Sequence, residues 1–327
     1  MKRRQISAAL GAFAFAGPIA FAQQGGEAWL PSRPLKLVVP WGAGGINDSL
    51  ARLAADRMAP VLKQAIAIDN RSGANGQIGT SAVLQAPADG HTLLLITSGQ
   101  HVLSVALGVK LPYHPLNDLA PLAQIGEFPV VIVVRKDLPA SNLQELLALA
   151  RSKPGKLNVG VSGLGAISHL TAERLMGETG TSMTVVNYRG EAQTINAMLA
   201  GEVDVGIIAN AAPYVRGRQM KAIASTGATR WSKLSEVPTL IELGLPGFTA
   251  VGWAGLAVSA KTPPAVLDAL RRAARGALDS EEVRANMRER GVEPSSRTGV
   301  ELAALMRGDA DRYSALVQSR NIKLDSN

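Results

Sequence analysis

The chain has 327 residues, of which 46% are hydrophobic and 18% charged, so it is long enough for two domains that each bury a core. It contains no cysteine, which excludes disulfides, thiolate metal sites and a cysteine nucleophile. Aromatic residues make up only 4%, and the net charge of +8 is dispersed along the chain. Nucleic-acid binding is therefore not expected, because neither a stacking platform nor a concentrated basic patch is evident.

The first 22 residues have the layout of an export signal. Three basic residues at 2–4 precede a mostly apolar stretch at 6–19, and Ala-Phe-Ala at 20–22 fits the small residues before a cleavage site. We therefore predict a signal peptide at 1–22, cleaved after Ala22, and a location in the periplasm. The remaining chain then has 31 basic and 26 acidic residues, a net charge of about +5. No later stretch is long and apolar enough to predict a membrane-spanning helix.

Strand and helix patterns alternate from residue 34 onward. A β-rich run at 34–40 is followed by apolar residues at helical spacing from Asp48 to about Lys63, with Asn47 or Asp48 as the expected N-cap. Further strands are expected at 65–70, 91–97 and 128–137. Such alternation predicts an α/β fold built on parallel strands.

The middle of the chain repeats the same theme and indicates a second α/β unit. A helix capped by Ser141 or Asn142 follows the strand at 128–137. Segments 157–180 and 183–210 then each show a strand, a glycine turn and a helix. An extended stretch at 245–260 and helices from Pro264, the last of them over 299–319, complete the chain.

Glycine-bearing turns at 42–45, 73–79 and 163–165 each lead into an expected helix. Glycine lets backbone N–H groups approach a ligand closely, and the N-terminus of a helix favours negative charge. Two units that each carry such a turn predict a cleft that grips an anion from both sides. The same spacing is equally typical of tight strand–helix connections without a ligand.

The sequence gives only partial support to the hypothesis of a catalytic site. The spacing Gly42-x-Gly44 after a strand, with Asp69 at the end of the next strand, is the pattern of a dinucleotide site, but Asn47 stands at the third glycine position. Ser162 lies in a turn, but Leu164 replaces the last glycine of a hydrolase elbow. The four histidines do not pair at metal-binding spacing. We therefore expect no catalytic residues, no metal and no cofactor, and we keep an exported dinucleotide-dependent enzyme, using the Gly42–Gly44 turn, as the alternative.

Six segments together resemble one family. They are RPLKLVVPWGAGGINDSLARL, IDNRSGANGQIGTSAVLQAPADGHTLLL, LPYHPLNDLAPLAQIG, KPGKLNVGVSGLGAISHLTAERL, VVNYRGEAQTINAMLAGEVDV and SEVPTLIELGLPGF. In this order they are similar to the motifs of the Bug-type extracytoplasmic solute-binding receptors of tripartite tricarboxylate transporters, over nearly the whole mature chain.

The resemblance implies a type II periplasmic-binding-protein fold, with two α/β domains around a ligand cleft that closes by hinge motion. Domain 1 would comprise 33–131 plus 249–327, and domain 2 would comprise 132–248. The implied function is capture of a small carboxylate, without enzymatic activity. The implied partners are the membrane subunits of a transporter, or a sensor, and the receptor itself would be a monomer.

The resemblance also implies ligand-binding positions, mostly at the glycine turns and the ends of strands. In the first unit they are Pro40, Trp41, Gly44, Gly45, Asn47, Asp48, Ser98 and Gln100. In the second unit they are Ser162, Gly163, Gly165, Ala166, His169, Arg189 and Asn210. The glycines at 42–45 would then cradle a carboxylate and not a phosphate.

One position departs from the family pattern. Where relatives usually carry a hydroxyl residue after the second glycine of the 163–165 turn, this chain has Ala166, followed by Ile167. The loss of a hydroxyl donor beside a helix start removes one hydrogen bond to a second anionic group. We therefore predict a ligand with one carboxylate and a less polar remainder, in preference to citrate-like acids.

Overall fold

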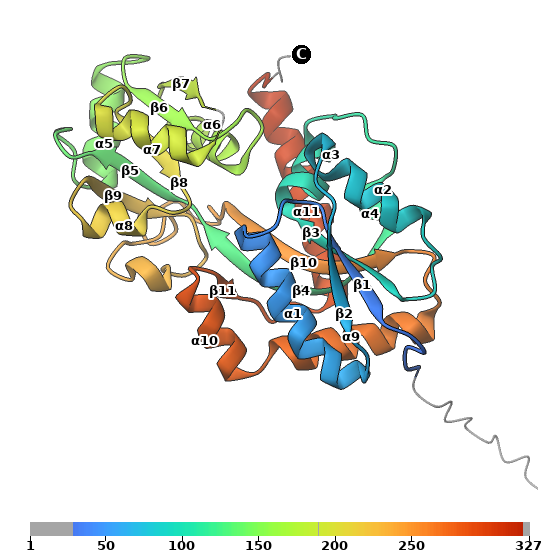
Figure 1. Ribbon diagram of the computed structural model, residues 1–327. Helices are drawn as coiled ribbons and strands as arrows, with labels where there is room; N and C mark the ends of the chain where they lie inside the picture. Colours follow the sequence, from blue (N-terminus) through green and yellow to red (C-terminus); the bar gives the residue numbers. More distant parts are fainter. Residues whose placement is uncertain (1–28, 189, 323–327) are drawn as a thin grey trace, which may run out of the picture.

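The computed structural model describes residues 29–188 and 190–322, so the predicted signal peptide and Arg189 lie outside the described residues. Two sheets, each flanked by helices, form the two parts of the molecule (Figure 1). None of the described helices combines the length and the apolar character that crossing a membrane requires.

The first sheet has six strands in the order β11-β4-β10-β3-β1-β2. Their bounds are β1 Leu35–Val39, β2 Ile66–Asn70, β3 Thr92–Thr97, β4 Leu119–Pro129, β10 Val251–Ser259 and β11 Glu293–Pro294. Strand β1 runs parallel to β2 and β3, whereas β10 runs antiparallel to β3 and β4. The prediction of parallel strands is thus confirmed for β1, β2 and β3, but the sheet as a whole is mixed because β10 returns from the second sheet in the opposite direction.

Helices cover both faces of this sheet. Leu37 points toward a core shared with α1 (Ile46–Leu62), α9 (Pro264–Leu278) and α10 (Glu281–Glu289), while the neighbouring Val38 packs on the α11 side (Gly299–Ser319). Successive strand residues thus serve opposite faces, as the pleat requires. The remaining helical segments of this part are η1 Ala74–Gly76, α2 Gln77–Gln85, η2 Gly99–Leu103, α3 Ser104–Ala106 and α4 Pro115–Asp118.

The second sheet has the order β7-β6-β8-β5-β9. Its strands are β5 Val131–Arg135, β6 Asn158–Val161, β7 Thr184–Asn187, β8 Val205–Ile208 and β9 Met220–Ser225. It is also mixed, since β6 runs parallel to β7 and β8 but β5 runs antiparallel to β8 and β9. Its helical segments are α5 Leu143–Ser152, α6 Ile167–Thr179, α7 Glu191–Ala200, α8 Ala212–Arg216 and η3 Ser232–Leu234.

Two chain segments cross between the sheets side by side. One joins β4 to β5 at Val130, and the other runs from β9 through Thr226 to Ala250 before β10. The fully buried Thr226 hydroxyl accepts a hydrogen bond from the Val130 N–H at 3.1 Å and donates to the Ala250 carbonyl at 2.7 Å. This side chain therefore ties both crossings together, while the exact domain boundaries at 131/132 and 248/249 stay a prediction.

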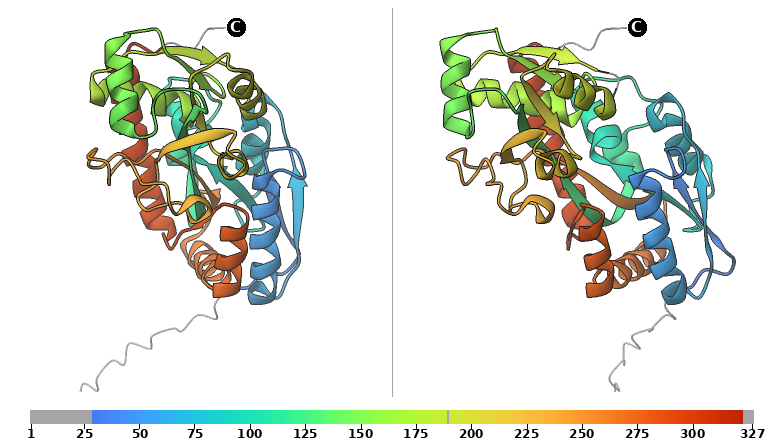
Figure 2. Two further views of the ribbon diagram at one scale, coloured as in Figure 1. Left: turned by 90° about the vertical axis from the view of Figure 1, so that its left-hand side faces the viewer. Right: turned by 60° about the vertical axis from the view of Figure 1, so that its left-hand side comes forward.

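Helix α11 contacts both parts of the molecule (Figure 2). Tyr313 packs in a cluster with Leu103 from the first part and Leu170 of α6. At the end of α11, Arg320 donates a hydrogen bond to Glu173 of α6 at 3.0 Å. The two sheets are thus joined by packing as well as by the two crossings.

Candidate functional site

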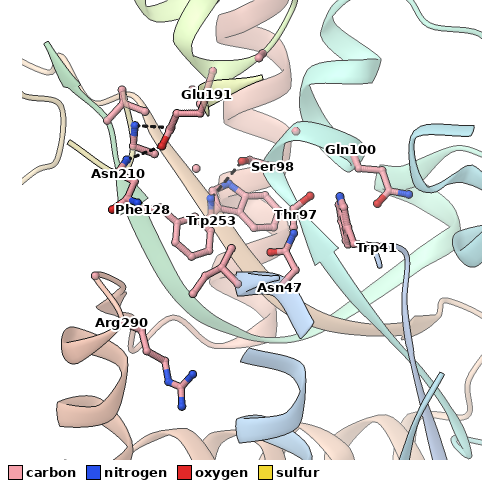
Figure 3. A pocket seen from close by; sticks show the side chains of 18 of the residues that line it. Trp41, Asn47, Thr97, Ser98, Gln100, Phe128, Glu191, Asn210, Trp253 and Arg290 are labelled. Atoms are coloured by element: carbon pink, nitrogen blue, oxygen red, sulfur yellow. Dashed lines mark hydrogen bonds between the residues drawn. The ribbon is translucent and has the colours of Figure 1, made fainter. Parts of the chain in front are cut away.

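A cleft of about 1220 Å³ opens between the two sheets, and both contribute to its lining. From the first part come Thr97 and Ser98 at the end of β3, and Trp253 of β10. From the second part come the residues at the start of α6 and Asn210 after β8. Figure 3 shows Asn210 and Glu191 on one side of the cleft, with Trp41 and Gln100 on the other. The site therefore lies where the carboxyl ends of strands meet helix starts, the usual ligand position in α/β sheets.

The structure brings seven of the fifteen predicted ligand-binding residues into the wall of this cleft. Those that line it are Trp41, Asn47, Ser98, Gln100, Gly165, Ala166 and Asn210. Those that lie outside the lining are Pro40, Gly44, Gly45, Asp48, Ser162, Gly163 and His169, while Arg189 is not among the described residues. Contact of any of them with a ligand stays a prediction.

Asp48 stabilises the first glycine turn, at 42–45, from the side away from the cleft. Helix α1 begins at Ile46 with Gly45 as its N-cap, so the expectation that Asn47 or Asp48 caps the helix was wrong. The Asp48 side chain, only 4% exposed, accepts hydrogen bonds from the Gly44 N–H at 3.0 Å and from the Arg52 guanidinium at 2.9 Å. Asn70 of β2 donates to its other oxygen at 3.0 Å.

These hydrogen bonds hold the charged form of Asp48. The bond from Arg52 is the main cause that lowers the pKa of this carboxyl to about 2, against an opposing effect of burial and with further support from Gly44 and Asn70. Gly44 has φ +85°, a conformation that a residue with a side chain rarely adopts. The turn is thus fixed in shape, and its next residues, Ile46 and Asn47, face the cleft.

The second glycine turn is held in the same manner by side chains of its own helix. The Nδ1 atom of His169 accepts from the Gly165 N–H at 3.0 Å, and the Ser168 hydroxyl accepts from the Ser162 N–H at 3.0 Å. Burial lowers the pKa of His169, so the ring is neutral and able to accept. His169 therefore shapes the turn, while Gly165 and Ala166 reach the cleft.

Helices α1, α6 and α7 begin at the cleft, where Asn47, Ile167 and Glu191 are part of its wall, and α2 begins two residues after Asn75, which also lines it. Their N-cap residues are Gly45, Gly76, Ala166 and Gly190, none of which has a side-chain acceptor. The N–H groups of a first helical turn have no partner within the helix. The cleft is therefore supplied with backbone donors and with the positive ends of helix dipoles, an arrangement that suits an anion.

The rest of the wall is largely apolar, and sequence reasoning missed most of it. Phe128, Trp231 and Trp253 line the cleft from three different segments. A predominantly apolar wall with a few placed polar groups is typical of small-molecule sites. These residues are far apart in the sequence and read locally as core residues, so no local signal distinguishes them.

Glu191 was also missed, although it lies two positions after Arg189, which was predicted to bind the ligand. Its carboxylate accepts hydrogen bonds from the backbone N–H groups of Ala209 at 2.8 Å and Asn210 at 2.9 Å (Figure 3). All three residues line the cleft. The cleft thus contains an anionic group of the protein itself.

The geometry gives little support to a dinucleotide site, a serine hydrolase site or a metal site. Asp69, the acid of the dinucleotide pattern, pairs with Arg71 at 2.9 Å and Lys36 at 3.4 Å and is not part of the cleft wall. The Ser162 hydroxyl lies 3.3 Å from the Thr194 hydroxyl and has no histidine as partner. Within 29–188 and 190–322, no group of three or more histidine, aspartate or glutamate residues is placed to hold a metal ion.

Comparison with known proteins agrees with this geometry. Residues 50–322 match the family described as "Tripartite tricarboxylate transporter family receptor". The protein BugT of Bordetella pertussis is 30% identical over 297 residues, which cover 90% of this chain and 91% of BugT.

Two solved structures from Rhodopseudomonas palustris are similar over most of both chains. One, described as solved with adipate, is 32% identical with a TM-score of 0.75 and covers 90% of this chain and 99% of its own. MatC, described with bound malate, is 34% identical with a TM-score of 0.69 and covers 88% of this chain and 100% of its own. The predicted fold class, two α/β units around a cleft, is confirmed.

Proposed function

The chain belongs to the receptor family of tripartite tricarboxylate transporters, and from this premise we propose that it captures a small carboxylate in the cleft between its two sheets. The ligand's carboxylate would be held chiefly by backbone donors in the first turns of α1 and α6. The carbon skeleton would lie against the aromatic wall. The relatives solved with adipate and malate support a carboxylate as the ligand class.

The observation that carries this proposal is the set of helices that begin at the cleft without a side-chain cap. An uncapped helix start presents free N–H donors and the positive end of its dipole. Two of these helices, α1 and α6, belong to the parts built on the first and the second sheet, respectively. An anion between them would therefore be bound from both sides. The alternative of a dinucleotide enzyme is not favoured, since Asp69 is engaged elsewhere.

Several finer points belong to the same proposal. The protein would be exported to the periplasm, with cleavage after Ala22, and would act as a monomer without catalytic activity. It would hand its ligand to membrane subunits of a transporter, or present it to a sensor. The intact mass of protein isolated from the periplasm tests the cleavage site, and a full-length chain in the cytoplasm would contradict it.

The direct test is to identify what the cleft holds. Native mass spectrometry of freshly purified protein is expected to reveal a co-purifying carboxylic acid, and calorimetry with that acid is expected to show one site. Small-angle scattering is expected to give a smaller radius with the acid bound, since capture from both sides closes the cleft. If no carboxylic acid binds the protein in either measurement, the proposed function is wrong.

A further inference from the structure

The second-sheet wall of the cleft holds a fixed negative charge. Glu191 is the first residue of α7, and its two carboxylate oxygens accept from two consecutive backbone N–H groups, those of Ala209 and Asn210. No lysine or arginine among the described residues forms an ion pair with it. The charge is therefore held by backbone donors and faces the cleft.

These two donors occupy the position where a ligand anion would be expected. They follow β8 at its carboxyl end, the edge at which α/β sheets bind their ligands. Two adjacent N–H groups that point to the two oxygens of one carboxylate form a bidentate carboxylate site. In this chain the site is filled by Glu191 instead of a ligand.

We propose that Glu191 takes the place of a second ligand carboxylate, so that the receptor selects acids with a single carboxylate and an uncharged far end that carries N–H donors. This inference rests on the proposed function. Each oxygen of Glu191 has about two acceptor positions, and the backbone uses one of them. The remaining positions would accept hydrogen bonds from an amide at the far end of the ligand.

A dicarboxylate would meet two obstacles at this point. Its second carboxylate would find the N–H groups of Ala209 and Asn210 already bonded, and it would approach the like charge of Glu191. A hydrogen bond that involves a charged group changes affinity by roughly ten- to 150-fold. The discrimination should therefore be large enough to measure between two ligands of the same shape.

A second observation, at the start of α6, also favours a ligand with a single carboxylate. Ala166, the N-cap of α6, lines the cleft and has no hydroxyl with which to hold a second anionic group. It belongs to a different turn from Glu191, so the two features are independent of each other. Both reduce the capacity of the first turns of α6 and α7 to bind a second carboxylate.

The wild-type protein provides the first test, which needs no variant. Calorimetric titrations would compare succinate, glutarate and adipate with their monoamides, which have nearly the same shape but carry an amide in place of one carboxylate. At the chain length that binds best, we expect the monoamide to bind roughly tenfold or more tightly than the diacid. Equal or tighter binding of the diacid would overturn the inference.

A pair of variants then assigns the effect to one residue. Glu191→Ala frees the two N–H groups, so the preference should shift toward the diacid by roughly tenfold or more. Glu202→Ala removes the same charge from an exposed position outside the cleft and should leave the preference unchanged. A shift of equal size in both variants, or in neither, would contradict the role of Glu191. Failure of every monoamide and diacid to bind the wild type would instead contradict the proposed function.

Discussion

The helices that begin at the cleft and those that begin on the outer surface differ in how their first turns are satisfied. Three outer helices carry side-chain caps, in which an N-cap residue accepts from a backbone N–H: Asn142 from Glu145, Ser280 from Val283 and Thr298 from Glu301. The four cleft helices start with glycine or alanine. Side-chain caps thus occur at three outer helices, although not at α9, whose N-cap is Pro263. The four cleft helices lack them, and a bound anion would serve as their cap.

The contrast extends to the two glycine turns. In both, side chains of the following helix hold the turn from the side away from the cleft: Asp48 bonds Gly44 in one, and His169 bonds Gly165 in the other. One support is a buried charge and the other a neutral ring. The two halves of the cleft therefore reach similar shapes through different chemistry: the first support requires a charged carboxylate, and the second requires an imidazole that stays unprotonated at Nδ1.

The largest effect on ligand affinity is expected when a cleft helix receives the side-chain cap that it lacks. Gly45 has an extended conformation, with φ −78° and open space where a Cβ would stand. In Gly45→Asp, the new carboxylate should cap α1 and repel a ligand carboxylate. We expect affinity for the best-binding acid to fall by more than about tenfold, while the free energy of unfolding rises by a few tenths of a kcal/mol.

The matched control is Gly45→Ala, which adds a Cβ but no acceptor and no charge. It should lose far less affinity than the aspartate variant. Calorimetry measures the binding and urea unfolding measures the stability of both proteins. Similar affinities in the two variants would show that the open start of α1 does not bind the ligand.

The second prediction sharpens the difference between the two turns. Because the pKa of Asp48 is lowered from an ordinary 3.8 to about 2 in the folded protein, its charged form stabilises the fold at any pH above 3.8. This contribution is lost as the pH falls through about 2. Since Arg52 is half exposed, we estimate it at about 1–2 kcal/mol.

Asp48→Asn should therefore be less stable than the wild type by that amount near neutral pH, and the difference should vanish toward pH 2. Urea unfolding of both proteins across this range measures the difference and cancels the titration of all other groups. A difference that does not change with pH would mean that the charge of Asp48 is not what holds the turn.

The smallest effect is expected on the outer surface. Thr298 and Glu301 form a reciprocal capping box at the start of α11. Thr298→Ala removes the side-chain acceptor and should lower the free energy of unfolding by about 1 kcal/mol. Ligand affinity, measured by calorimetry, should stay at the wild-type value, since neither residue lines the cleft. A clear loss of affinity would contradict the prediction that caps of outer helices affect stability but not ligand binding.

Local sequence signals predicted much of the fold. The last helix was expected over 299–319 and is found there, and Asn142 was among the two expected caps of α5. Glycine turns marked the starts of α1, α2 and α6. Each of these features depends on residues within a few positions of one another, so its physical cause is visible in a short window.

The missed features depend on distant partners. The direction of β10 depends on β3 and β4, which lie more than a hundred residues earlier in the chain. Glu191 reads locally as an ordinary acidic residue in a first helical turn, and its partners stand 18 and 19 residues away. Asp48 was taken for a cap because its type favours that role, whereas Gly45 fills it and Asp48 supports the turn.

The distribution of tryptophan has an optical consequence. Of the four tryptophans in the chain, Trp41, Trp231 and Trp253 line the cleft, and Trp29 packs edge-on against His91 with 5.7 Å between ring centroids. Indole emission shifts when the surroundings of the ring exchange water for apolar groups. Trp231 and Trp253 are only 4% and 0% exposed, whereas Trp41 is partly exposed at the cleft. A ligand that displaces water from the cleft should therefore shift the emission of Trp41 in particular.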